Sequence, residues 1–244
     1  MVEPAPCERL PWDSEFFRRS IARVTLSSLD PAQMSRVTEW CRTQSIDCLY
    51  LLSDAGDLRT ANLAAQNGFI LVDLRVTLEA RPEVTRSPTS GAAIRPAVPD
   101  DVPALREIAR TSHRDSRFYQ DPHFASSECD ALYETWIEKS CAGYADVVLV
   151  AVADNRAGGY VSCHLSGTGA ARIGLFAVAA GARGRGVGLA LVDGALRWFR
   201  ERNAARVSVV TQGRNVAAQR LYQRAGFVTA SVALWHHRWF DRHG

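Results

Sequence analysis

The sequence predicts an α/β fold, in which helices and strands alternate along most of the chain. Apolar runs of strand length alternate with longer runs that have helical periodicity. A glycine-rich segment separates one such strand from the helix that follows it. The two halves of the chain also share one order of elements, which indicates a duplicated unit. The 244 residues suffice for one large domain or two small ones.

The first half of the chain shows the pattern helix, strand, helix, strand. We expect these elements near 31–45, 48–53, 57–67 and 69–78. Residues 80–92 are polar and rich in proline, serine and threonine, a composition typical of a linker. We therefore divide the chain into domains at 1–85 and 93–244, with the linker at 86–92.

The second half begins with a short strand near 94–97. Asp100 or Asp101 is expected to cap the next helix, whose first turn contains Pro103. One or two helices follow between 113 and 140. The remaining expected elements are strands near 146–153 and 158–165 with a turn at 154–158, a strand near 171–178, a helix near 186–202, a strand near 206–212, a helix near 215–225 and a strand near 227–237.

The two halves align without gaps when 158 is added to each residue number of the first. Trp40 then matches Trp198, and Gly68 matches Gly226. The register extends over helix, strand, helix and strand, which indicates duplication. Residues 25–30, which lie opposite the glycine-rich segment, contain no glycine and no arginine. The first copy is therefore expected to keep the elements and to lack the chemistry.

The glycine-rich segment lies between a strand-like run at 173–178 and a helix-like run at 187–202. A strand, a glycine turn and a helix start expose unpaired N–H groups to a phosphate, and glycine allows close approach. Its spacing, Arg-x-x-Gly-x-Gly, differs from the Walker loop and from GxGxxG. The alternative is a tight turn with exposed arginines. The glycine-rich segment consists of Arg183, Gly184, Arg185, Gly186, Val187 and Gly188.

Asn215 and Tyr222 lie seven residues apart on a predicted helix, so both face one side, roughly 10 Å apart. The small Ala218 lies between them. An extended ligand along this helix would meet an amide at one end and a phenol at the other. Asn215 as a helix cap and Tyr222 as a core aromatic are the structural alternatives. The first copy has Asp57 and Ala64 at these positions.

The composition excludes several functional classes. The net charge is +3, and the 29 basic residues, of which only Lys139 is a lysine, are scattered among acidic ones, which disfavours nucleic-acid binding. The six cysteines form no CxxC pair and no zinc-spaced cluster with histidine, so we expect no metal site. The N-terminus lacks the pattern of a signal peptide and the longest apolar run, 147–153, is short. We expect a cytoplasmic protein.

Residues 94–240, with Arg-x-x-Gly-x-Gly followed by Asn-x-x-Ala-x-x-x-Tyr-x-x-x-Gly-Phe, resemble the GCN5-related N-acetyltransferases (GNAT). The resemblance implies a mixed central sheet flanked by helices in a catalytic domain at 93–244. A truncated GNAT-like domain would precede it. It also implies transfer of an acetyl group from acetyl-CoA, the co-substrate, to a primary amine of a small molecule, with no metal.

The resemblance assigns roles to individual residues. The N–H groups of loop 183–188 would hold the pyrophosphate, and Asn215, beside Ala218, would bind the pantetheine arm. Tyr222 would lie near the sulfur and act as general acid. A backbone N–H would stabilise the tetrahedral oxyanion. The strand edge that would pair with the pantetheine amides and supply this N–H comprises Phe176, Ala177 and Val178.

The group that deprotonates the amine is not singled out by the sequence. His113, His164 and His236 are candidates. Asp73 is the tentative base, because it is a lone acid in an apolar strand-like run and would face a cleft. The alternative is that Asp73 faces solvent.

A narrower resemblance, to the dTDP-fucosamine acetyltransferase group, rests on segments at 10–17, 116–118, 136–138, 171–175 and 235–238. It implies acetylation of the 4-amino group of a dTDP-linked 4-amino-4,6-dideoxygalactose, and a homodimer is plausible from it. The chain departs from that group by its full glycine loop. This departure leaves CoA binding intact and leaves open whether the acceptor is the same sugar.

The residues themselves give limited support for a nucleotide sugar. Arg117 would meet a diphosphate, and Phe118 or Tyr119 would stack on a base. The alternative is a surface turn before Asp121. Other functional hypotheses are acetylation of an aminoglycoside, a polyamine or a protein amine, and a catalytically silent acyl-CoA-binding regulatory module.

Overall fold

The structure, a computed structural model, describes residues 5–82, 92–153, 156–167 and 169–240. The chain forms two compact units, each of which is discontinuous in sequence. The first takes its described residues from 1–75, 120–123 and 232–244, and the second from 76–119 and 124–231. The linear division at 86–92 stays a prediction, because residues 83–91 lie outside the described part.

In the first unit, strands and helices alternate along the chain. It shares two long strands, β4 (Ile70–Ala80) and β10 (Val228–Trp239), with the second unit. Its other elements are β1 (Cys7–Arg9), α1 (Pro11–Phe17), β2 (Ile21–Val24), α2 (Pro31–Thr43), β3 (Cys48–Asp54) and α3 (Leu58–Gln66). The first three of these were not predicted from the sequence, because they are too short to show a periodic pattern.

The second unit contains the predicted alternation of helices and strands. Its elements are β5 (Ala93–Pro96), a 3-10 turn (Pro99–Asp101), α4 (Val102–Ser112), α5 (Arg117–Gln120, whose last residue belongs to the first unit), α6 (Ser126–Lys139), a π turn (Ser140–Tyr144), β6 (Val147–Ala153), β7 (Arg156–Leu165), β8 (Ala170–Val178), a 3-10 turn (Ala180–Ala182), α7 (Val187–Arg200), β9 (Arg206–Gln212) and α8 (Val216–Arg224).

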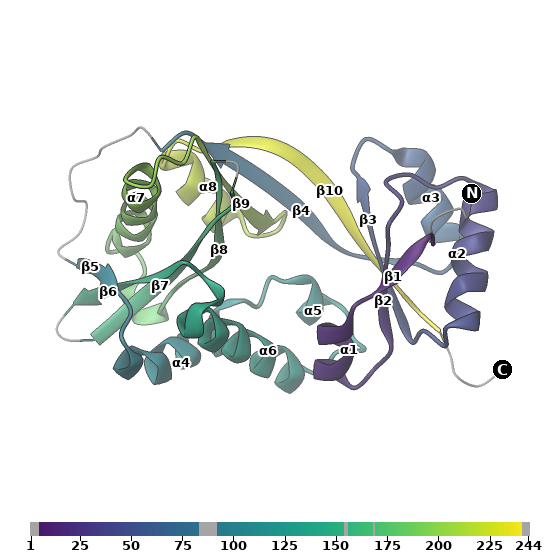
Figure 1. Cartoon of the computed structure of the whole chain (residues 1–244), viewed down its shortest axis with the longest axis horizontal. Coiled ribbons are helices and arrows are strands. Elements are labelled where there is room, and N and C mark those ends of the chain that lie inside the picture. Colours follow the sequence, from purple (N-terminus) through teal and green to yellow (C-terminus); the bar gives the residue numbers. More distant parts are fainter. Residues whose placement is uncertain (1–4, 83–91, 154–155, 168, 241–244) are drawn as a thin grey trace. The chain divides into compact units, whose positions relative to one another are not determined.

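The strands are hydrogen-bonded in the order β1-β2-β3-β10-β4-β9-β8-β7-β6-β5. The pairs β2·β3 and β8·β9 are parallel, whereas β1·β2, β3·β10, β5·β6, β6·β7 and β7·β8 are antiparallel. In the second unit, α7 and α8 lie on one side of the strands and α4 and α6 on the other (Figure 1). The expected mixed sheet flanked by helices is confirmed.

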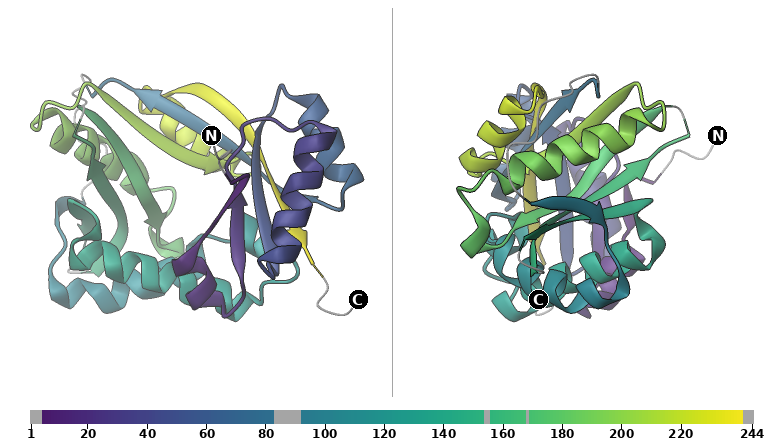
Figure 2. Two further views of the ribbon diagram at one scale, coloured as in Figure 1. Left: turned by 45° about the vertical axis from the view of Figure 1, so that its right-hand side comes forward. Right: turned by 90° about the vertical axis from the view of Figure 1, so that its left-hand side faces the viewer.

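Helix α2 covers β3 in the first unit (Figure 2, left). Asp30 caps the helix: its carboxylate accepts from Gln33 N at 2.8 Å, while the Gln33 side chain accepts from Asp30 N at 2.9 Å. The buried face of α2 carries Met34, Val37 and Cys41, which pack in one core with Leu49 and Leu51.

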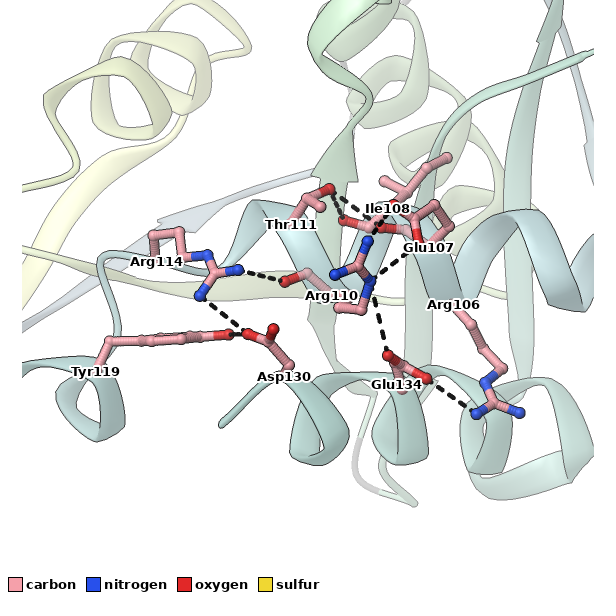
Figure 3. Close-up of polar contacts among 9 residues, drawn as sticks. All are labelled: Arg106, Glu107, Ile108, Arg110, Thr111, Arg114, Tyr119, Asp130 and Glu134. Atoms are coloured by element: carbon pink, nitrogen blue, oxygen red, sulfur yellow. Dashed lines mark hydrogen bonds and ion pairs between the residues drawn. The ribbon is translucent and has the colours of Figure 1, made fainter. Parts of the chain in front are cut away.

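Ion pairs join α4 and the segment directly after it to α6 in the second unit (Figure 3). Arg106 contacts Glu134 at 2.9 Å, and Arg114 contacts Asp130 at 2.9 Å. Because these arginines are about half exposed, each pair is worth on the order of 0–1 kcal/mol. Arg110, also on α4, lies 2.7 Å from Glu107 of the same helix and 3.9 Å from Glu134 of α6.

The internal repeat is confirmed in the positions of the elements. The bounds of β3 and β9, and those of α3 and α8, differ by 158 residues. Asp57 caps α3 by accepting from Thr60 N at 3.0 Å, and Asn215 caps α8 by accepting from Ala218 N at 3.1 Å. In both copies, therefore, a side-chain oxygen caps the N-terminus of the helix at the same position.

Two local predictions were wrong. Asp101 stands at the start of α4 but makes no side-chain cap there; its carboxylate binds Arg95 at 2.7 and 2.9 Å and accepts from Val98 N at 2.8 Å. Strand β7 already begins at Arg156, inside the turn expected at 154–158, and residues 154–155 lie outside the described part. Pro103 lies in the first turn of α4, as expected.

The cysteines that the structure describes are all free thiols, and all except the partly exposed Cys141 are buried. They act as small apolar residues of the two cores, as the sequence predicted. Among the helices of the described ranges, none has both the length and the apolar character needed to cross a bilayer.

Candidate acetyl-CoA site

The glycine loop of the second unit leads directly into α7. Gly184 and Gly186 have φ of 74° and 76°, a region that glycine occupies without a steric cost. Gly186 is the N-cap of α7 and has no side chain to satisfy the first N–H groups of the helix. These donors, together with the exposed Arg183 and Arg185, fit an anionic ligand such as a pyrophosphate.

The first turn of α7 packs closely on its neighbours. A Cβ atom added at Gly188 would lie 3.3 Å from Leu221 Cδ2 and 3.5 Å from Phe176 Cζ. Arg183 Nε donates to the carbonyl oxygen of Val178 at 3.2 Å, which ties the loop to the end of β8. The loop, α8 and the end of β8 therefore form one packed group, as the sequence motifs require.

Strand β8 is paired on both sides only in its first half. Its parallel ladder with β9 extends from Ala170↔Arg206 to Ile173↔Val209, and within these two fully described strands it ends there. The later residues 176–178 pair with β7 alone. Their other edge is thus open to an extended ligand, in the manner of strand addition.

The direction of individual N–H groups follows from two hydrogen bonds of β8. Leu175 N donates to Ser162 Oγ at 2.7 Å, and Ala179 N donates to Gly158 O at 2.9 Å, both toward β7. Because successive N–H groups of a strand point to opposite sides, those of Phe176 and Val178 point to the open edge.

Asn215 and Tyr222 both lie on α8, as predicted. The Oδ1 atom of Asn215 serves as the helix cap, so this structural interpretation holds, and the Nδ2 group of the same amide supplies two further donors. The Tyr222 ring packs edge-to-face on Phe176, with ring centroids 5.8 Å apart. Its burial raises the pKa of the phenol, so Tyr222 keeps its proton at neutral pH.

The candidate bases lie in different places. In the first unit Asp73 is buried on β4, so the alternative of a solvent-facing carboxylate is wrong, and His236 is buried on β10. In the second unit His113 follows α4 and His164 lies on β7. Burial lowers the pKa of His113, His164 and His236, so all three favour the neutral form. The choice among these bases stays a prediction.

The imidazole of His113 lies in an aromatic cluster of the second unit. Its Nε2 atom is 2.9 Å from the Tyr160 hydroxyl, and its ring stacks on Tyr133 with centroids 4.2 Å apart. Burial lowers the pKa of His113 to about 4. The unfolded state therefore binds more protons between about pH 4 and 6.5, and stability is lost as the pH falls through this window.

We expect the free energy of unfolding to fall by about 1–3 kcal/mol more in the wild type than in His113→Gln over this pH window. The glutamine amide can still form a hydrogen bond with the Tyr160 hydroxyl but does not titrate. Urea unfolding at both ends of the window measures the difference. If the free energy of unfolding falls equally in the two proteins, His113 is still accessible to protonation in the folded state.

The predicted acceptor residues are largely engaged in packing. Phe118 is 3% exposed and contacts Phe124 and Trp136 edge-to-face. Arg117 lies over the Phe118 ring, 4.2 Å from its centroid. The Tyr119 hydroxyl donates to Asp130 at 2.6 Å. The burial of Phe118 disfavours stacking on a base, and the substrate roles of Arg117 and Phe118 stay predictions.

Sequence reasoning missed a buried carboxylate in the first unit. Asp121 Oδ2 accepts from His237 Nδ1 at 2.7 Å and from Trp239 Nε1 at 2.8 Å, and Oδ1 lies 2.8 Å from His123 Nδ1. Burial alone would raise the pKa of Asp121, but these hydrogen bonds lower it below its usual range. The run of histidines and tryptophans on β10 was the one available signal. It did not point to Asp121, which is far away in sequence.

Comparison with known proteins identifies the family. The model of the acetyltransferase (GNAT) family matches residues 103–227. The chain is 33% identical over 96% of its length to the dTDP-fucosamine acetyltransferase of Escherichia coli, of which it covers 98%. It is 26% identical over 93% of its length to the spore coat polysaccharide biosynthesis protein SpsD of Bacillus subtilis, of which it covers 81%.

A solved structure shows the same fold at lower sequence identity. The GCN5-related N-acetyltransferase of Sphaerobacter thermophilus superposes with a TM-score of 0.66 at 16% identity, over 96% of this chain and 76% of that one. Fold, family model and full-length relative agree. The chain therefore belongs to the GNAT family and is an acetyltransferase, whose donor is acetyl-CoA.

Proposed function

We propose that the protein acetylates the 4-amino group of a dTDP-linked 4-amino-4,6-dideoxy sugar. The observation that carries this acceptor is the similarity to a dTDP-fucosamine acetyltransferase over nearly the whole of both chains. The second relative, whose name places it in polysaccharide biosynthesis, also matches over most of its length. The similarity also covers the first unit. Most of that unit lies outside residues 103–227, the segment that the family model matches.

The second unit supplies the donor site in this proposal. The N–H groups at the start of α7 and the two loop arginines bind the pyrophosphate of acetyl-CoA. The open edge of β8 at 176–178 pairs with the pantetheine amides. The Nδ2 group of Asn215 donates to the same arm. The packing of Tyr222 on Phe176 supports a place for the phenol near the thioester end.

The reaction is a direct transfer. The lone pair of the neutral amine attacks the thioester carbonyl carbon, and the carbonyl π pair moves to oxygen. The N–H of Phe176, which points to the open edge, stabilises this oxyanion; such a donor is worth roughly 3–4 kcal/mol. When the carbonyl re-forms, the C–S bond breaks and the thiolate takes the proton of Tyr222. The surplus proton on nitrogen passes to a base, for which Asp73 is the candidate.

Thiol release from acetyl-CoA, followed with a panel of amines, tests the acceptor. We expect turnover with the dTDP-linked 4-amino sugar and at least about tenfold lower kcat/KM with aminoglycosides, polyamines and peptide amines, because a difference of about 1.4 kcal/mol in transition-state binding gives a factor of ten. The same sugar without its nucleotide is the matched control. Turnover of a polyamine or an aminoglycoside, with none of any nucleotide sugar, would overturn the proposal.

A further inference from the structure

A β-bulge interrupts β8 at the point where β8 separates from β9. On β7, Val161 and Cys163 are two residues apart, but their partners on β8, Phe176 and Ile173, are three apart. Strand β8 therefore contains one extra residue, and the ladder with β9 ends at Ile173, directly before it. A bulge of this kind bends its strand and leaves a backbone group without a ladder partner.

The extra residue also determines which side chains face α7 and α8. Ile173 and Phe176 both pack in the core that contains Val161 and Cys163. In a regular strand, residues three apart would face opposite sides of the sheet. Because of the bulge, Phe176 faces Tyr222, and its N–H points to the open edge of β8.

Ser162 takes over the backbone group that the bulge leaves without a partner. Its side chain is buried, and its Oγ atom accepts from Leu175 N at 2.7 Å. The same Oγ atom lies 3.3 Å from His164 Nε2. Because Ser162 Oγ already accepts from Leu175 N, its hydroxyl proton can be donated to His164 Nε2 in the tautomer that carries the ring proton on Nδ1.

Gly174 leaves the space in which this contact forms. A Cβ atom at this position would lie 2.5 Å from His164 Nε2 and 2.7 Å from Ser162 Oγ. We call this arrangement the clamp. It consists of the side chains of Ser162 and His164 on β7 and of Gly174 on β8, which leaves room for them.

We propose that Ser162, held by His164, is a positioning residue of acetyl transfer. By fixing Leu175 N toward β7, it directs the Phe176 N–H to the thioester carbonyl oxygen. The proposal rests on the donor site proposed above and adds the residues that set its geometry. In this proposal both side chains act through the backbone of β8, a role separate from that of His164 as a candidate base.

Isotope-edited infrared spectroscopy of bound acetyl-CoA, labelled with carbon-13 at the carbonyl, reads this geometry without an acceptor. A hydrogen bond from Phe176 N–H lowers the carbonyl stretching frequency of the wild-type complex. We expect Ser162→Ala to lose at least half of this shift and to lower kcat by about 10–100-fold, as a small misplacement of a catalytic group does. CoA affinity should remain within about twofold, since the glycine loop is unchanged.

Ser208→Ala is the matched control, because the Ser208 hydroxyl donates to Ala171 O at 3.4 Å, on the part of β8 that is still paired with β9. It should keep the full shift. His164→Leu fills the space of the ring but cannot accept from Ser162, and it should lose part of the shift. This second variant decides the question if Ser162→Ala does not fold.

The outcomes separate the two proposals. A wild-type complex without any carbonyl shift would overturn the role of Phe176 in the donor site. A wild-type shift that persists unchanged in Ser162→Ala, or in His164→Leu if only that variant folds, would overturn the clamp alone. Loss of shift and turnover with CoA affinity retained would support it, because a merely unfolded fraction would lower the number of CoA sites instead.

Discussion

Replacement of Tyr222 by phenylalanine is expected to lower kcat by about 10²–10⁴-fold, the range found for removal of a positioned general acid. The phenol is buried against Phe176, and burial raises its pKa, so it enters the reaction protonated. Phenylalanine keeps the ring contacts but leaves the departing thiolate to take its proton from water. The measurement is steady-state thiol release with the preferred amine.

Two controls separate this effect from a loss of binding. The affinity of Tyr222→Phe for CoA, measured by calorimetry, should stay within about twofold of the wild type, because no pyrophosphate contact is removed. Tyr144→Phe removes the hydroxyl of a tyrosine that is 69% exposed and should keep full activity. Equal turnover of Tyr222→Phe and wild type would remove Tyr222 from the mechanism.

A glutamate at position 186 is expected to abolish acetyl-CoA binding. Gly186 has a φ of 76° and caps α7, so any other residue there is strained by roughly 1–2 kcal/mol. A carboxylate at this helix start would also occupy the N–H groups and repel the pyrophosphate. Calorimetric titration should detect no binding at concentrations that saturate the wild type.

The matched control is Gly167→Glu, which adds the same charge where a new Cβ meets no atom within 4 Å. It should bind acetyl-CoA normally. Thermal unfolding of Gly186→Glu should still be cooperative, since the strain is small beside the stability of a domain. A wild-type affinity in Gly186→Glu would show that the loop does not hold the pyrophosphate.

The features that could be predicted from the sequence are those that local chemistry determines. Gly184 and Gly186 allow a turn with positive φ without a steric cost, and the periodic patterns of α7 and α8 give their bounds to within two residues. The duplicated unit was recognisable because a strand, a helix and a cap recur at a constant separation. The cap formed by Asn215 follows from its position before an apolar helical run.

The features that escaped prediction depend on contacts between distant segments. Asp100 or Asp101 was expected to cap α4, but the carboxylate of Asp101 binds Arg95 instead. Asp121 meets His237 across more than a hundred residues of chain. The role proposed for Ser162 depends on the bulge in β8, and a single serine in a strand sequence does not indicate such a bulge. Contacts between residues that are far apart in the chain leave no pattern in the local sequence, so they could not be predicted from it.

The acceptor that we propose for this GNAT enzyme is a nucleotide-linked amino sugar. The most direct test of this proposal is to incubate the wild-type protein with acetyl-CoA and a dTDP-linked 4-amino-4,6-dideoxygalactose, and to identify the product by mass spectrometry and NMR. We predict one acetyl group, bonded to the nitrogen at carbon 4, with one CoA thiol released for each product formed. Unchanged sugar, together with acetylation of an amine that carries no nucleotide, would contradict it.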